Sequence, residues 1–515
     1  MRNEFIYTSI ISSILFLSLS IFHSPFWLIP YGLIFPFIIW GTIELYDKKH
    51  TIIANYPIFG RFRYIMEELR PKIYQYFIES DTDGTPINRV NRSIVYQRAK
   101  KQLDTTPFGT QLNVYEPGYE WINHSMNPLP LDSINPNDLR IKIGGENCRQ
   151  PYSSSLLNIS AMSYGSLSSN AIEALNWGAK LGGFAHNTGE GGLSPYHEKH
   201  GGDLIWQIGT GYFGCRKEDG TFCEKSFSER ASKPQVKMIE IKLSQGAKPG
   251  HGGILPAAKN TPEIAKIRQV KVGTSVNSPG KHSAFQGPEG LINFIHKLRE
   301  LSGGKPIGFK LCMGQPEEFD QLCAVMKEKN IFPDFITIDG GEGGTGAAPP
   351  EFSNSIGMSL RDGLIFANNS LLKYGIRSKL KILASGKVIT GFDIIKILAL
   401  GADACYAARA MMLSLGCIQA LICNQNKCPT GIATQKPHLI KGLNIEDKYV
   451  RVANYHLGTL ESVAEIMCAS GIDSLEKIGR RHIWRRISFN EIKNYEELFP
   501  YPNNIENILE HKKIG

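Results

Sequence analysis

Three cysteines near residue 420 form the densest group of metal-binding side chains in the sequence. Cys417, Cys423 and Cys428 are separated by five and four residues, and a proline follows Cys428. Iron–sulfur clusters are held by local cysteine thiolates, often with proline after the last one, whereas zinc prefers four ligands. The spacing therefore favours a three-iron cluster. A zinc site with His438 as fourth ligand and a purely structural turn are the alternatives.

Five loops rich in glycine and polar residues follow short apolar segments of the chain. They are residues 160–166, 187–192, 245–250, 340–346 and 385–387. Glycine lets backbone amides approach a ligand closely, and such amides, together with Lys387 and Arg409, suit a phosphate. A single loop of this kind would indicate only a tight turn. Five of them predict a phosphorylated cofactor that lies across one surface.

The segments between these loops predict the elements that position them. Expected strands are 156–160, 183–186, 204–208, 238–243, 307–311, 335–339, 382–385 and 404–407, and expected helices include 169–181, 317–329 and 391–400. This alternation predicts an α/β fold, a (β/α)8 TIM barrel with its chemistry at the strand carboxyl ends. A doubly wound sheet is the alternative, but the Gly-x-Gly-x-x-Gly turn that usually follows its first strand does not occur there.

The first 49 residues contain two apolar stretches, 5–22 and 26–45, separated by a short break at His23-Ser24-Pro25. Each is near the roughly 20 residues that cross a bilayer as a helix, so a transmembrane hairpin anchor is expected at residues 1–49. Arg2, Lys48 and Lys49 flank the hairpin, which predicts the inner (cytoplasmic) membrane with the catalytic part facing the cytoplasm. A cleaved signal peptide is the alternative for the first stretch, but no Ala-x-Ala-like site follows it.

Composition narrows the class of protein further. The 515 residues include 57 Lys plus Arg and 48 Asp plus Glu, a net charge of +9 that is scattered, so nucleic-acid binding is not indicated. The apolar share of 42% excludes a mainly disordered chain, and the seven other cysteines are dispersed, as in a reducing compartment. We expect an α/β lead-in region at 50–150, the barrel with the cysteine triad at 151–440, and a C-terminal helical extension at 441–515.

The five loops, in this order and with this cysteine triad, resemble the FMN-binding synthase domain of glutamate synthases. Residues 245–250 and 428–435 carry the most specific similarity, which covers about 150–440. The chain resembles even more closely the short, membrane-anchored bacterial members of that family, where the likeness extends to 55–57 and 75–77. This resemblance implies a (β/α)8 barrel that carries FMN, and a 3Fe–4S cluster bound by Cys417, Cys423 and Cys428.

The resemblance also implies which residues bind each group. The FMN contacts would be Ala161, Met162, Ser163, Gln207, Lys310, Glu342, Gly343, Gly344, Thr345, Gly346, Ser385, Gly386, Lys387, Ala408 and Arg409. An oxoacid such as 2-oxoglutarate would be bound by Lys242, Lys248 and Arg268, with Glu190 and Lys248 as the catalytic proton carriers. Without the resemblance, a solvated charge or a structural ion pair explains any one of these residues equally well.

The implied activity is reductive amination of 2-oxoglutarate with ammonia to L-glutamate by an oxidoreductase of the CH–NH2 class. A ferredoxin-like protein or a reductase would supply electrons, which pass through the cluster to the flavin. No cysteine follows Met1, so we expect no glutaminase activity in this chain, and free ammonia or a separate glutaminase would supply nitrogen.

Three residues depart from the family pattern. His251 replaces an acid, Tyr212 replaces an arginine near the flavin, and Ile254 replaces a glutamine that contacts the oxoacid. The loss of that polar contact leaves two alternatives open. One is an FMN and iron–sulfur oxidoreductase that acts on another oxoacid, imine or amine, and the other is a non-catalytic electron-transfer subunit of the membrane.

Overall fold

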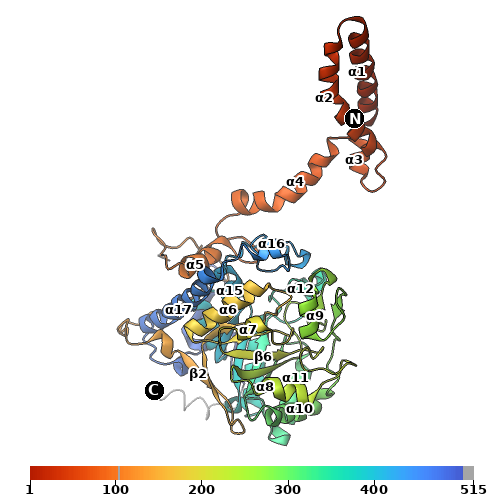
Figure 1. The fold of residues 1–515 in the computed structure, drawn as a ribbon. Helices are drawn as coiled ribbons and strands as arrows, with labels where there is room; N and C mark the ends of the chain where they lie inside the picture. Colours follow the sequence, from red (N-terminus) through yellow and green to blue (C-terminus); the bar gives the residue numbers. More distant parts are fainter. Residues whose placement is uncertain (103–104, 503–515) are drawn as a thin grey trace. The chain divides into compact units, whose positions relative to one another are not determined.

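The computed structural model describes residues 1–102 and 105–502 and divides into two compact units, Met1–Arg89 and Val90–Gly515. The first unit begins with two apolar helices, α1 (Arg2–Phe22) and α2 (Leu28–Leu45), joined by a short 3-10 turn (Figure 1). Both helices are long and apolar enough to cross a membrane, and nearly all their side chains are uncovered. By length and composition they are candidate membrane spans, a test that a signal sequence or a core helix also passes.

The rest of the first unit consists of α3 (Thr51–Asn55), α4 (Gly60–Ile73) and a π-helical turn, Tyr74–Ile78. Glu44, in the last turn of α2, is only 3% exposed. Its carboxylate accepts the backbone N–H of Ile58 at 2.6 Å and the Nε of Arg61. A buried carboxylate requires such partners, so this contact joins the end of α2 to the start of α4.

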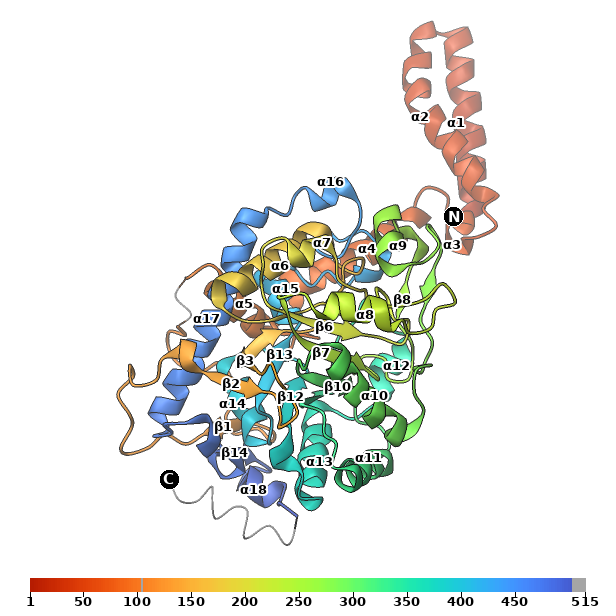
Figure 2. The same ribbon diagram turned by 60° about the horizontal axis from the view of Figure 1, so that its bottom comes forward.

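The second unit is built on eight parallel strands that close into a barrel. They are β4 (Leu157–Ile159), β5 (His186–Asn187), β6 (Leu204–Ile208), β7 (Val236–Lys242), β10 (Ile307–Leu311), β11 (Phe335–Asp339), β12 (Lys381–Ser385) and β13 (Ala404–Ala407). Each strand pairs with the next, and β13 pairs with β4 to close the cylinder (Figure 2). The predicted (β/α)8 barrel is therefore confirmed.

Helices cover the outside of the barrel. They are α6 (Ser169–Gly182), α8 (Glu224–Ala231), α10 (Gly287–Leu301), α11 (Pro316–Lys329), α13 (Leu360–Lys373), α14 (Gly391–Ala399), α15 (Arg409–Ser414) and α17 (Ile445–Ala469). Trp206 of β6 stacks on Phe227 of α8 with ring centroids 5.3 Å apart, so the main apolar core lies between strands and helices. Because side chains alternate along a strand, the next residue, Gln207, points into the barrel.

Shorter elements complete the second unit. A hairpin of β2 (Arg140–Ile143) and β3 (Tyr152–Ser155) precedes the barrel, and the long segment after β7 holds β8 (Ile254–Leu255), β9 (Val276–Asn277) and α9 (Pro262–Arg268). Beyond residue 440, the chain forms not only α17 but also β14 (Ile483–Arg486) and β15 (Ile492–Asn494), which join β1 (Glu120–Ile122) in one antiparallel sheet. From residue 441 to residue 502 the chain therefore contains strands as well as helices. Residues 503–515 of the expected extension lie outside the described residues.

Candidate active site at the barrel mouth

Four predicted substrate residues come from separate segments and converge at one place. Glu190 follows β5, Lys242 ends β7, Lys248 lies in the next loop, and Arg268 ends α9. The Nζ of Lys242 lies 2.9 Å from Oε1 of Glu190. Lys248 and Arg268 are close enough to act electrostatically on the same carboxylate. The fold therefore assembles a charged cluster that is buried beside the carboxyl ends of the strands.

Glu190 is ionised in this cluster. Burial alone would raise the pKa of its carboxyl, but the positive charges of Lys242, Arg268 and Lys248 outweigh burial and lower it. Two glycines allow the backbone to pass close to the carboxylate. A Cβ at Gly253 would lie 2.3 Å from Oε1, and one at Gly209 would lie 2.6 Å from Oε2, so larger residues would displace Glu190.

Lys248 has an ammonium group with a lowered pKa. Its side chain is buried, and its Nζ donates a hydrogen bond of 2.9 Å to the carbonyl of Gly252. Burial, with some repulsion from Lys242, lowers the pKa of its ammonium group from 10.5 to about 8. A group with such a pKa gains and loses a proton readily near neutral pH, which suits general acid catalysis.

Arg268 presents an unpaired buried N–H group. Its Nη2 donates to the carbonyl of Tyr164 at 3.1 Å and to Oγ of Ser163 at 3.4 Å, and its guanidinium carbon lies 5.2 Å from the centre of the Phe213 ring. Its Nε, in contrast, is buried without a partner among the described residues. Burial lowers the pKa of Arg268 to about 10, so it stays charged at neutral pH. A buried donor without an acceptor is costly.

On the cofactor side, Lys310 forms an ion pair with Asp339, the last residue of β11. The two charged groups are 3.2 Å apart. Burial disfavours the ammonium of Lys310, but Asp339 and Glu240 outweigh burial and raise its pKa. Asp339 also accepts the backbone N–H of Gly246 at 2.9 Å and the hydroxyl of Ser385. The sequence prediction did not include Asp339, although it ends a predicted strand.

Glu240 is a second acid that the sequence prediction did not include. It is fully buried in β7 and accepts hydrogen bonds from Asn187 at 2.9 Å, Gln207 at 2.6 Å and Thr337 at 2.7 Å. The bond from Gln207 fixes a side chain that was predicted to contact FMN. The sequence could have predicted that Glu240 lies inside the barrel. A charged residue in the middle of an apolar strand must point toward polar partners, and in a barrel these lie inside.

The predicted phosphate-binding side chains, Lys387 and Arg409, lie after β12 and β13. Arg409 donates from Nη2 to the carbonyl of Glu342 at 2.7 Å, and a Cβ at Gly344 would lie 3.0 Å from Cδ of Arg409. The loop after β11 therefore rests directly on Arg409. The first N–H groups of a helix have no partner within it, and α15 begins at Arg409. The donors there, with Gly386 and Lys387 after β12, fit the phosphate of FMN.

The predicted FMN contacts Ala161, Met162 and Ser163 lie in the loop after β4. Gln207 and Lys310 lie near the ends of β6 and β10, and Ser385 ends β12. The other predicted contacts lie in the loops after β11, β12 and β13. All these positions lie in the carboxyl-terminal parts of barrel strands or in the loops that follow them. In a (β/α)8 barrel this is the end where ligands bind. The structure thus places every predicted cofactor residue at the same end of the barrel.

The three cysteines lie in the segment after α15. Their thiols influence one another electrostatically, so they are near neighbours, and burial raises the pKa of Cys417 to about 11. At Cys428, hydrogen bonds from backbone N–H groups, with the Thr430 hydroxyl 3.3 Å from the sulfur, outweigh burial and lower the pKa. Such donors are typical around iron-bound thiolates.

Within 1–102 and 105–502, no three His, Cys, Asp or Glu side chains are grouped to hold a metal ion. Ligands that each bind a different iron of a cluster would lie farther apart than ligands of one ion.

The three departures from the expected family pattern have different surroundings, and His251 lies with its ring 5.4 Å from that of Phe352. Ile254 lies in β8 and pairs with Asn277 of β9, inside the long segment that carries Lys248 and Arg268. Tyr212 is buried, and its hydroxyl lies 3.0 Å from Nδ1 of His282, whose Nε2 lies 2.9 Å from the carbonyl of Lys242. Tyr212 therefore supports the backbone that carries Lys242.

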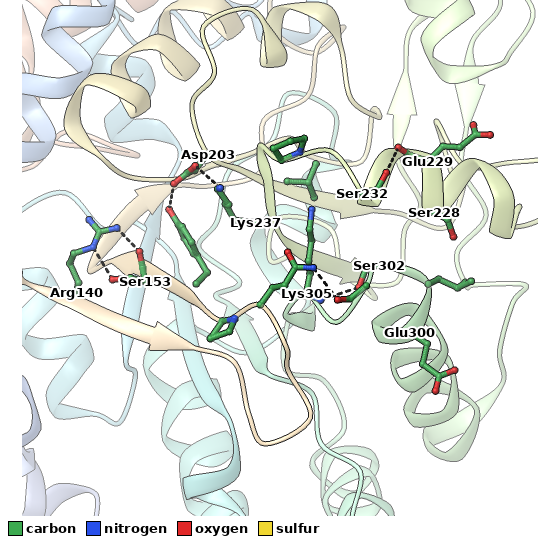
Figure 3. A pocket seen from close by; sticks show the side chains of 17 residues that line it. Arg140, Ser153, Asp203, Ser228, Glu229, Ser232, Lys237, Glu300, Ser302 and Lys305 are labelled. Carbon is green, nitrogen blue, oxygen red and sulfur yellow. Dashed lines mark hydrogen bonds and ion pairs between the residues drawn. The ribbon is translucent and has the colours of Figure 1, made fainter.

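A separate cavity of about 1120 Å³ lies at the other end of the barrel, where the chain enters β6, β7 and β10 (Figure 3). Lys305 lines it and donates to the carbonyls of Ala231 at 2.6 Å and Lys233 at 2.8 Å, and Lys237 lies 3.7 Å from Asp203. These charged groups have protein partners. The predicted site residues are not among those that line this cavity.

Comparisons with known proteins identify the family of the chain. The family model described as a conserved region in glutamate synthase matches residues 120–473, more than half of the chain. The glutamate synthase large subunit-like protein YerD of Bacillus subtilis (strain 168) is 38% identical over 505 residues, which cover 90% of this chain and 95% of that protein.

Two further comparisons cover different shares of the proteins matched. The archaeal-type glutamate synthase (NADPH) of Thermotoga maritima is 36% identical over 333 residues, which cover 64% of this chain and 62% of that protein, less than two thirds of its length. A crystal structure of mandelate oxidase matches with a TM-score of 0.42 and 13% sequence identity. The match covers 83% of this chain and 98% of that one, and it adds no information beyond the barrel topology described above. From the family model and the relative in Bacillus subtilis, we conclude that the chain belongs to the glutamate synthase family.

Proposed function

We propose that the chain is a glutamate synthase-like oxidoreductase that converts 2-oxoglutarate and ammonia to L-glutamate. The observation that carries this proposal is the charge of the cluster: three cationic side chains, Lys242, Lys248 and Arg268, surround the single carboxylate of Glu190. This excess of positive charge in a buried place favours an anion. A dicarboxylate such as 2-oxoglutarate supplies two negative charges and so complements it.

Each side chain has a role that follows from its surroundings. Arg268 would bind a carboxylate through its unpaired Nε. Formation of an imine from an oxoacid and ammonia releases water, and Lys248 would donate the proton that the departing hydroxyl needs. Glu190, which is ionised, would accept the proton released by the attacking nitrogen. Lys242 would hold Glu190 in position through their ion pair.

The reduction of the imine requires two electrons and two protons, which no side chain of the cluster can supply. FMN, when bound, supplies two-electron reduction. We propose that its phosphate is held by Gly386, Lys387, Ala408 and Arg409, and that Lys310 contributes positive charge near an electron-rich ring. The loops after β4 and β11 would enclose the remainder.

Electron delivery and location form a further part of the proposal. We propose that Cys417, Cys423 and Cys428 bind a 3Fe–4S cluster that accepts electrons from a ferredoxin-like protein or a reductase. The two apolar helices α1 and α2 would anchor the chain in the inner membrane, with the barrel on the cytoplasmic side. Ammonia, free or released by a separate glutaminase, would supply the nitrogen.

A second candidate function is the reduction of an imine derived from a different oxoacid. The observation that favours it is Ile254, an apolar side chain in the segment between Lys248 and Arg268. The test is turnover by the protein loaded with FMN and iron, with ammonia, a chemical reductant and a panel of oxoacids. Preference for 2-oxoglutarate supports the first candidate, whereas preference for an oxoacid without the second carboxylate supports the other. Ile254→Gln should shift preference toward 2-oxoglutarate.

A further inference from the structure

Helix α4 carries an apolar stripe that is largely exposed. Phe62, Ile65, Met66, Leu69 and Ile73 recur at intervals of three or four residues and so share one face of the helix. Phe62 is 62% exposed and Ile65 is 51% exposed. Gly60 is the one buried residue of this helix, all of which the structure describes. An uncovered stripe of this kind indicates a contact surface.

The charged residues of α4 are arranged around this stripe in a specific way. At 3.6 residues per turn, Arg61 and Lys72 fall on one border of the stripe and Arg63 and Arg70 on the other, each about 80–100° from its centre. The two acids, Glu67 and Glu68, lie farther round toward the opposite face. Long basic side chains at the border of an apolar face can bury their stems and extend their charges to anionic headgroups.

The position of α4 in the chain points to the same environment. The helix follows α2 after a short segment that contains α3 (Figure 1). The contacts of the Glu44 carboxylate with Ile58 and Arg61 join the start of α4 to the last turn of α2. If α2 crosses a bilayer, its last turn reaches the headgroup region, because the helix has the length of the hydrocarbon core. The start of α4 is then held at that depth.

The π-helical turn after α4 extends the apolar surface. Tyr74, Tyr76 and Phe77 are 47%, 56% and 84% exposed, and Ile78 is 64% exposed. Aromatic side chains, tyrosine above all, are favoured where the bilayer meets water because their rings are apolar while the hydroxyl remains solvated. The helix thus has basic residues at the borders of its stripe, acids on the far side and aromatic residues at its end. This combination suits a lipid surface better than it suits an acidic or a purely apolar protein partner.

We propose that residues 60–78 lie in the membrane–water interface as a second membrane contact, with the apolar stripe toward the acyl chains. Arg70 and Lys72 at its borders contact anionic headgroups, whereas Arg61 and Arg63 pair with Glu44 and Glu67. This inference rests on the membrane anchor proposed above and adds a lipid-binding surface to it.

Photo-crosslinking of the full chain in vesicles of phosphatidylethanolamine and phosphatidylglycerol tests the proposal. The photoreactive residue p-benzoylphenylalanine replaces Phe62 on the stripe, Glu68 on the far side, or Leu33 in α2, which is 71% exposed. We expect lipid adducts at positions 33 and 62, and several-fold fewer at position 68. Adducts at position 33 with protein crosslinks at position 62, or equal lipid yields at 62 and 68, would overturn the inference alone. The absence of lipid adducts at position 33 would overturn the anchor and this inference with it.

The headgroup contact has its own test in the same vesicles. The double variant Arg70→Gln and Lys72→Gln should reduce lipid adducts at position 62 several-fold and leave those at position 33 unchanged. The matched control removes two exposed lysines of the other unit, Lys477→Gln and Lys493→Gln, which are 35% and 43% exposed and should change neither yield. An unchanged yield at position 62 in the α4 variant would contradict the role of the basic border.

Discussion

The amino group of Lys259 donates a hydrogen bond of 3.0 Å to the backbone carbonyl of Cys423. The same group donates to the carbonyls of Ser166 and Ala433, also at 3.0 Å. An ammonium group has three protons, so all of them are used, although Lys259 is only 4% exposed. One buried cation thus joins the loop after β4, which carries the predicted flavin contacts, to both ends of the segment that contains Cys428.

Lys259→Met should loosen the cysteine segment. The change removes the donor from three carbonyls, of which that of Ala433 is in a buried contact and would cost about 1–3 kcal/mol if left unpaired. We expect the thiols of Cys423 and Cys428 to react faster with an alkylating reagent in iron-free protein, and the purified protein to hold less iron. Mass spectrometry of the alkylated peptides and iron analysis measure the two effects. Lys305→Met is the matched control, since Lys305 is also buried and bonded to carbonyls, but at the other end of the barrel. Equal thiol reactivity in the two variants would contradict this role of Lys259.

Each of Cys417→Ser, Cys423→Ser and Cys428→Ser should abolish the paramagnetic signal of a three-iron cluster. A serine hydroxyl is a poor substitute for a thiolate that binds iron. Iron content should fall in these variants while FMN content is retained, because the predicted flavin contacts come from other loops. Cys405→Ser serves as control, since this cysteine is fully buried in β13. Full iron content in any of the three variants would exclude that cysteine as a ligand.

Arg268→Lys should raise KM for 2-oxoglutarate more than it lowers kcat. Lysine keeps the charge but loses the planar fork that holds a carboxylate, and the loss of one charged hydrogen bond of about 1.5–3 kcal/mol corresponds to a roughly 10- to 100-fold rise in KM. Steady-state kinetics over a range of oxoacid concentrations measures both constants. Arg216→Lys is the control, because Arg216 contacts the same Phe213 ring, at 5.7 Å. A similar change in both variants would argue against a carboxylate at Arg268.

The lowered pKa of Lys248 predicts opposite effects on turnover and on stability. As a proton donor, Lys248 must be protonated, so kcat should fall about tenfold per pH unit above pH 8. Between about pH 8 and 10.5 the unfolded chain binds the proton more tightly than the native one, so this group makes stability rise with pH in that window. Below about pH 8, Lys248 is charged in both the native and the unfolded chain, so its buried charge lowers the free energy of unfolding by a constant amount.

Lys248→Met should therefore raise the melting temperature at pH 7 while it abolishes turnover, and the gain in stability should shrink between pH 8 and 10.5. Differential scanning calorimetry across this range measures the effect. A variant that melts lower than the native protein at pH 7 would contradict the buried charge.

Much of the barrel could be predicted because its strands are short apolar runs that end in loops. The strands at 204–208, 307–311, 335–339 and 404–407 have the predicted bounds. The least accurate prediction was the strand at 183–186, where β5 begins three residues later. Gly183 there has a φ of 65° and ends helix α6, so the chain is still completing a helix cap.

The contacts of the site could be predicted only in part. The family resemblance named Glu190 and Lys310, but their partners depend on which strands are neighbours in the closed barrel. Lys310 meets Asp339 across the neighbouring strands β10 and β11, and this contact depends on the register of the two strands, which the local sequence pattern does not encode. The same holds for Lys259, whose partners come from three distant segments, and for the sheet that β14 and β15 form with β1.

The most direct test of the proposed function is a single-turnover experiment with the protein loaded with FMN and iron. The chemically reduced protein is mixed anaerobically with 2-oxoglutarate and 15N-labelled ammonia, and the amino acids are then analysed by mass spectrometry. We predict 15N-labelled L-glutamate in an amount that matches the FMN oxidised, and none with Glu190→Gln or Lys248→Met. Oxidation of the flavin without labelled glutamate, or no oxidation at all in fully loaded protein, would contradict the proposed activity.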